Sequence, residues 1–77
     1  GPLDVHLQLG NAYFMKGDLA GSERAYKDAL RLDPKNDFAM KNIQVVYARA
    51  KNEGKLKIVE ITGAEGQTAP LLEVIQK

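Results

Sequence analysis

The sequence contains no cysteine and no tryptophan, and its only histidine is His6. Without cysteine, the chain can build neither a disulfide framework nor a metal site made of thiolates. One histidine is too few for a histidine-based zinc site within one chain. We therefore expect no catalytic, metal-binding or cofactor-binding residues, and no cofactor. These absences favour a protein that is not an enzyme.

The chain also lacks an excess of charge of either sign. Eleven basic and ten acidic side chains are interspersed, for a formal net charge of +1. This balance lacks the basic excess that binding to nucleic acid or to an anionic membrane requires, so we expect neither partner. No apolar run approaches the roughly 18 residues that a membrane-spanning helix needs, so we expect no membrane insertion. The sequence also contains no visible signal peptide and indicates no compartment.

The first two residues, Gly1 and Pro2, resemble the scar left when a protease removes a tag. We therefore expect Leu3 to be an arbitrary cut into a longer natural protein, with the native N-terminus missing. With 77 residues the chain has room for one small domain. Chains below roughly 80 residues often need a staple or a partner to complete their core.

Helical spacing dominates the first half of the chain. His6, Leu9, Gly10 and Tyr13 fall on one stripe of a helix. Lys16-Gly17-Asp18 then predicts a chain reversal, because glycine adopts conformations that turns require and aspartate caps a following helix. A second stripe of small and large residues follows, and it comprises Ser22, Ala25, Tyr26, Ala29 and Leu30. Asp33-Pro34 ends this second helix, since the residue before a proline is pushed out of helical geometry.

The stretch from Leu9 to Pro34 resembles one tetratricopeptide repeat. The residues at the family's spacings are Leu9-Gly10, Tyr13, Gly17-Asp18, Tyr26, Ala29 and Asp33-Pro34. Two positions depart: His6 stands where the family often has tryptophan, and Ser22 stands where it usually has alanine. Serine is still small enough for a close contact between helices. The resemblance implies a pair of antiparallel helices.

The pattern begins again after Pro34. Met40, Ile43 and Tyr47 repeat His6, Leu9 and Tyr13, while Gln44 replaces Gly10. The fold class that we predict is all-α, with a repeat-like helix hairpin and a third helix at about 3–16, 18–32 and 37–52. A tail follows, with a possible short strand at 55–62, a loop at 63–67 and a short C-terminal helix at 69–77.

The tail is too apolar for a solvated linker. We divide the chain into the scar at 1–2, a helical repeat region at 3–54 and a capping or oligomerisation tail at 55–77. The tail could fold back over the helices, pair or swap with a second chain, or begin a following domain. Its candidate oligomerisation residues are Leu56, Ile58, Val59, Ile61, Leu71, Leu72, Val74 and Ile75.

The resemblance also implies a function, because the first helices of such repeats line a concave face that binds a partner protein or peptide. The candidate partner-binding residues are Leu7, Asn11, Phe14, Met15, Lys41, Asn42, Val45 and Arg49. Asn11 and Asn42 partly resemble the family's clamp for a terminal carboxylate, but Leu7 stands where that clamp has a cation.

We therefore expect a noncovalent interaction module within a scaffold or adaptor protein. The alternative is a structural element that assembles copies of itself through the tail. A competing interpretation of the concave face is that the tail or another chain buries Phe14 and Met15.

Overall fold

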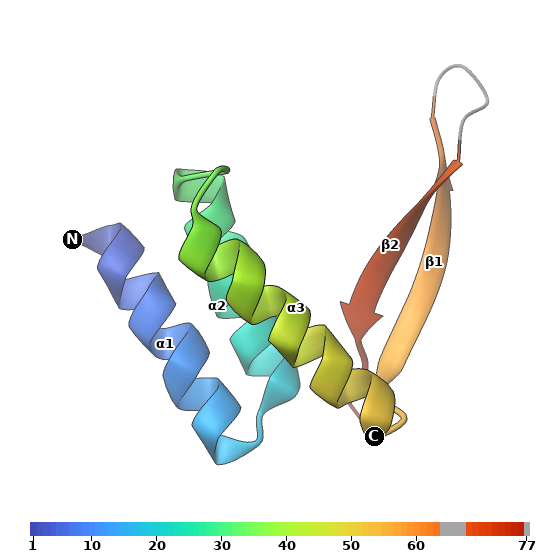
Figure 1. Cartoon of the computed structure of the whole chain (residues 1–77), viewed down its shortest axis with the longest axis horizontal. Coiled ribbons are helices and arrows are strands. Elements are labelled where there is room, and N and C mark those ends of the chain that lie inside the picture. The colour runs from blue at the N-terminus through green and yellow to red at the C-terminus, as the bar shows by residue number, and fades with distance from the viewer. Residues whose placement is uncertain (64–67, 77) are drawn as a thin grey trace.

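The computed structural model describes residues 1–63 and 68–76, with the backbone alone described at 60–62 and 68–70. The elements follow in the order α1 (Pro2–Lys16), α2 (Leu19–Leu32), α3 (Asp37–Asn52), β1 (Leu56–Thr62) and β2 (Thr68–Val74). The three helices pack together, and the two strands form a hairpin on the side of α3 away from α1 (Figure 1). The three predicted helices are confirmed to within one residue at each end.

The turn between α1 and α2 forms at the predicted residues. Gly17 has a left-handed backbone with φ of 84°, and its N–H donates to the carbonyl of Phe14. Such a positive φ favours glycine because a Cβ atom would be strained there. The carboxylate of Asp18 then accepts the N–H of Gly21 at 2.9 Å, which caps α2. These two residues reverse the chain and make α1 and α2 antiparallel.

A second cap begins α3. The side-chain oxygen of Asn36 accepts the N–H of Ala39 at 2.8 Å, so Asn36 is the N-cap. At the other end, Gly54 has φ of 69° and begins the turn towards β1.

The helices approach closely where a small residue faces a large one. A Cβ atom added to Gly10 would lie 2.6 Å from the ring of Tyr26, which is shorter than any real contact. The Ser22 hydroxyl donates to the carbonyl of Gly10 at 2.7 Å and thereby ties α2 to α1. This contact extends into a core whose other buried members are Leu19, Ala20, Ala29, Ala39, Ile43, Val46, Ala50 and Val74.

The predicted C-terminal helix at 69–77 is wrong. Residues Thr68–Val74 form β2, which pairs with β1 in antiparallel register from Leu56 opposite Val74 to Thr62 opposite Thr68. Pro70 suggested the first turn of a helix, but proline is also tolerated on an edge strand. The predicted strand is confirmed, with β2 of the same chain as its partner. Most of the predicted loop, residues 64–67, lies outside the described residues.

The hairpin joins the helical core only at its base. β2 contacts α2 and α3, while β1 contacts α3. Val74 is buried and Leu56 packs against the core, but Ile58 is 66% exposed and Leu71 is 40% exposed. Three more candidate oligomerisation residues are half-buried: Val59, Leu72 and Ile75. Only the backbone of Ile61 is described.

Candidate partner-binding face of α1 and α3

The first and third helices lie side by side and present a common surface. α1 contacts α3 directly, and neither strand contacts α1 (Figure 1). We call this surface the α1/α3 face. The predicted partner-binding residues all belong to these two helices, and they are Leu7, Asn11, Phe14, Met15, Lys41, Asn42, Val45 and Arg49.

The predicted residues divide into an exposed set and a set that supports it. Met15 is 77% exposed and Val45 is 51% exposed, which are high values for apolar side chains. Leu7 and Phe14 are half-buried and pack against the core. The other exposed members are polar or basic: Asn11, Lys41 and Arg49. The α1/α3 face therefore combines accessible apolar groups with basic ones.

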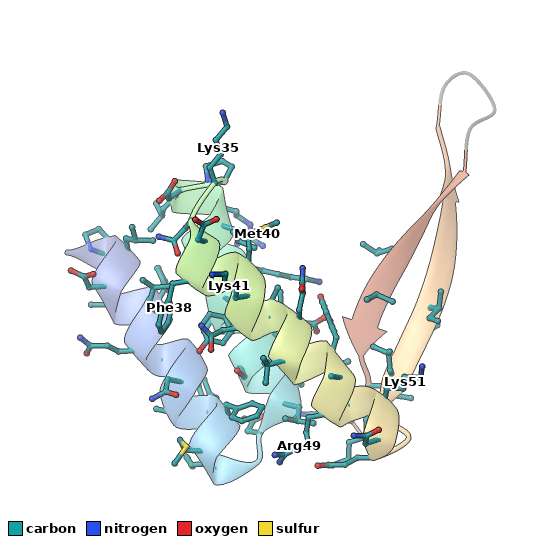
Figure 2. All side chains as sticks on the ribbon, in the orientation of Figure 1. Lys35, Phe38, Met40, Lys41, Arg49 and Lys51 are labelled. Carbon is teal, nitrogen blue, oxygen red and sulfur yellow. The ribbon has the colours of Figure 1, made fainter. Side chains whose placement is uncertain are left out.

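A cation–π contact joins the two helices of this face. The guanidinium carbon of Arg49 lies 5.1 Å from the centre of the Phe14 ring. The same guanidinium lies 4.0 Å from the carboxylate of Glu53. Figure 2 shows Arg49 near the C-terminal end of α1. Because the hairpin lies beyond α3 and Met15 is exposed, the interpretation in which the tail buries Phe14 and Met15 is wrong.

The geometry does not favour a carboxylate clamp at Asn11 and Asn42. The side-chain amide of Asn42 donates to the carbonyl of Phe38 at 2.7 Å, within its own helix. Leu7, which stands in place of the clamp's cation, packs into the core. The asparagines thus lack a cation at this position with which to hold a carboxylate.

Sequence reasoning missed Phe38 on this face. Its side chain is 54% exposed and lies between α1 and α3 (Figure 2). In the sequence, Phe38 stands three residues before Lys41 and seven before Val45, which places all three on one stripe of a helix. That spacing could have identified it.

A buried carboxylate was also missed. Glu23 on α2 is 4% exposed, and its oxygens accept the backbone N–H of Val74 at 3.3 Å. The ammonium of Lys27 lies 3.5 Å from the same carboxylate. Burial raises the pKa of Tyr47, and hydrogen bonding to Glu23, the charge of Glu23 and then that of Glu73 raise this pKa further. This cluster anchors the hairpin to the helices and lies apart from the α1/α3 face.

A comparison with protein families bears on the first two helices. The family model of the tetratricopeptide repeat matches residues 3–36. Residues 3–36, less than half of the chain, are similar to one tetratricopeptide repeat. The match covers α1, α2 and the connection to α3. The close contact between Gly10 on α1 and Tyr26 on α2 lies within it. Tetratricopeptide repeats generally mediate protein–protein interaction and are not catalytic.

Comparisons with curated proteins and with solved structures found no match for the chain. Across residues 1–63 and 68–76, no helix is long and apolar enough to cross a membrane. The same part of the chain holds no group of three or more histidine, aspartate or glutamate residues that could bind a metal ion.

Proposed function

We propose that this chain is a protein-interaction module that binds a segment of a partner protein on the α1/α3 face. The supporting observation is the exposure of apolar side chains on this face, with Met15, Phe38 and Val45 each more than half exposed. Exposed apolar patches rimmed by polar groups are typical of interaction surfaces. The hairpin does not contact α1, and these three side chains remain exposed beside it, so the surface stays accessible.

Charge narrows the class of partner. Lys41 and Arg49 are exposed on the same face, and Arg49 lies between the Phe14 ring and the carboxylate of Glu53. Complementary charges steer association and fix the register of a bound segment more than they raise affinity. The preferred partner is therefore a segment with apolar side chains that insert between α1 and α3 and with acidic side chains that face these two cations.

A selection from random peptides displayed on phage tests this proposal, with the whole chain as bait. Selected peptides are expected to be apolar and acidic, and Val45→Asp is expected to weaken their binding at least about tenfold by placing a charge at the centre of the face. Leu32→Asp on α2 is the matched control, because Leu32 is 53% exposed and Val45 is 51% exposed. Equal binding by wild type and both variants would contradict the proposal.

A further inference from the structure

The two edges of the β-hairpin differ in their free backbone groups. In an antiparallel pair, opposite residues alternate between those that exchange hydrogen bonds and those whose N–H and C=O point outward. The N–H of Ile75 donates to the carbonyl of Lys55 at 2.7 Å, whereas the N–H of Val74 donates to Glu23 instead. The backbone N–H and C=O groups of Val74 therefore point away from β1. The same holds for every second residue before Val74 in β2.

The outer edge of β2 is closed to further pairing. From the register of the hairpin, the residues whose backbone groups point away from β1 are Val74, Leu72, Pro70 and Thr68. Glu23 already accepts the N–H of Val74, and Pro70 has no N–H to donate. Proline on an edge strand and a covering side chain are two ways in which natural sheets prevent edge-to-edge pairing.

The outer edge of β1 lacks such protection along its described length. Its outward-facing residues are the partners of that β2 set: Leu56, Ile58, Glu60 and Thr62. Leu56–Thr62 includes no proline, and β1 is the strand farther from the helices in Figure 1. Ile58 is 66% exposed, so the edge is accessible at that residue. A two-stranded sheet is only marginally stable in water, and a third strand would stabilise it.

We propose that β1 pairs along this open edge with β1 of a second copy, which creates a four-stranded antiparallel sheet in the order β2-β1-β1-β2. The partner is a second copy because the edge is complementary to itself. With Val59 on the two-fold axis, Leu56 stands opposite Thr62 of the other copy and all seven residues of the strand pair. In this register Ile58 stands opposite Glu60, and Lys57 opposite Ile61, so no like charges face each other.

The arrangement of the helices permits this pairing. The helices adjoin the Leu56 end of β1, and the hairpin extends away from them (Figure 1). In an antiparallel pair the two Leu56 ends lie at opposite ends of the sheet, so the helices of the two copies stay apart. The inference does not depend on the α1/α3 face, which remains free for a different partner.

Light scattering over a series of concentrations, with charge variants at Val59, tests the proposal. The wild-type mass is expected to rise from one chain to about two as concentration increases. Val59→Lys and Val59→Glu are each expected to remain single chains, because residue 59 faces its own copy at a pair of close side chains. An equal mixture of the two variants is expected to recover the two-chain mass. A wild-type mass of one chain throughout, or a mixture that stays at one chain, would overturn the proposal.

A pair of proline variants tests whether copies pair through the edge of β1 or the edge of β2, without using the charge variants at Val59. Ile58→Pro removes an outward N–H from β1, and Leu72→Pro removes an outward N–H from β2, so both leave the ladder between the strands intact. Ile58→Pro is expected to give a single chain, whereas Leu72→Pro is expected to keep the two-chain mass. Circular dichroism verifies that the helices remain folded. Retention of the two-chain mass by Ile58→Pro would contradict pairing through β1.

Discussion

The carboxylate of Glu23 accepts the backbone N–H of Val74 with both oxygens, each at 3.3 Å, across 51 residues of sequence. This contact fixes the end of β2 to the middle of the helical core. A buried carboxylate requires hydrogen bonds or a counter-charge, and Lys27 at 3.5 Å supplies the charge. One side chain of α2 therefore adds a polar anchor to the packing of Val74 and Leu56 against the core.

Replacing Glu23 tests this anchor. Glu23→Ala leaves the N–H of Val74 without its acceptor, and we expect a loss of about 1–3 kcal/mol in the free energy of unfolding. Glu23→Gln retains an acceptor oxygen of similar reach and is expected to lose less. Urea denaturation measures the free energies, and hydrogen exchange at the Val74 amide locates the effect. Unchanged exchange at Val74 in Glu23→Ala would show that the contact does not anchor the hairpin.

The close approach of α1 and α2 predicts the effect of filling Gly10. A Cβ atom there would lie 2.6 Å from the Tyr26 ring, which is 1% exposed and has little room to move. We expect Gly10→Ala to destabilise the chain by about 1–3 kcal/mol, although alanine is the better helix former by about 1 kcal/mol. Gln8→Ala, at an exposed residue of the same helix, is the control and should change stability by less than about 0.5 kcal/mol. A stabilised Gly10→Ala in urea denaturation would refute the close contact.

The environment of Tyr47 predicts how stability depends on alkaline pH. Its pKa is raised above the ordinary value of 10.0 in the folded chain, first by burial and then by Glu23 and Glu73. The folded chain thus holds this proton more tightly than the unfolded chain. The resulting stability is fully present below pH 10 and is lost as pH rises towards the folded-state pKa.

Tyr47→Phe removes this titration while retaining the ring. We expect the free energy of unfolding of wild type to fall relative to that of Tyr47→Phe above pH 10, by at most about 1.4 kcal/mol per pH unit. Urea denaturation at a series of alkaline pH values measures the difference. Parallel curves for the two proteins would contradict the raised pKa.

The contact between Arg49 and Phe14 predicts a measurable coupling between α3 and α1. The guanidinium lies 5.1 Å from the ring centre on a partly exposed surface. A cation–π pair in such a place contributes about 0.5–1 kcal/mol. A double-mutant cycle with Arg49→Gln and Phe14→Leu should return a coupling energy of that size in urea denaturation. A coupling near zero would mean that the two side chains contribute to stability independently.

The helical repeat was predictable because its signals are local. Gly17 and Asp18 determine the first turn through their own backbone and side-chain preferences, and Asn36 caps α3 in the same way. The second appearance of the pattern at Met40, Ile43 and Tyr47 correctly located the third helix. Each of these signals acts within a few residues, so a single sequence carries it in full.

The tail could not be predicted as well, because its structure depends on distant partners. β2 exists through pairing with β1, and a short apolar run such as Pro70–Val74 fits a helix or a strand when considered alone. The burial of Glu23 depends on Val74, far along the chain. On the α1/α3 face the predicted residues came from the repeat resemblance, which assigned no role to Phe38, although its spacing from Lys41 and Val45 places it on the same stripe.

The most direct test of the α1/α3 face as a binding surface is a chemical-shift map of the backbone amides, recorded while the best peptide from the phage selection is added. The account predicts that the largest shifts fall on α1 and α3, around Met15, Phe38, Val45 and Arg49, with little change in the last turn of α2 at Leu32. Shifts concentrated on the hairpin or on α2, with α1 and α3 unaffected, would contradict it.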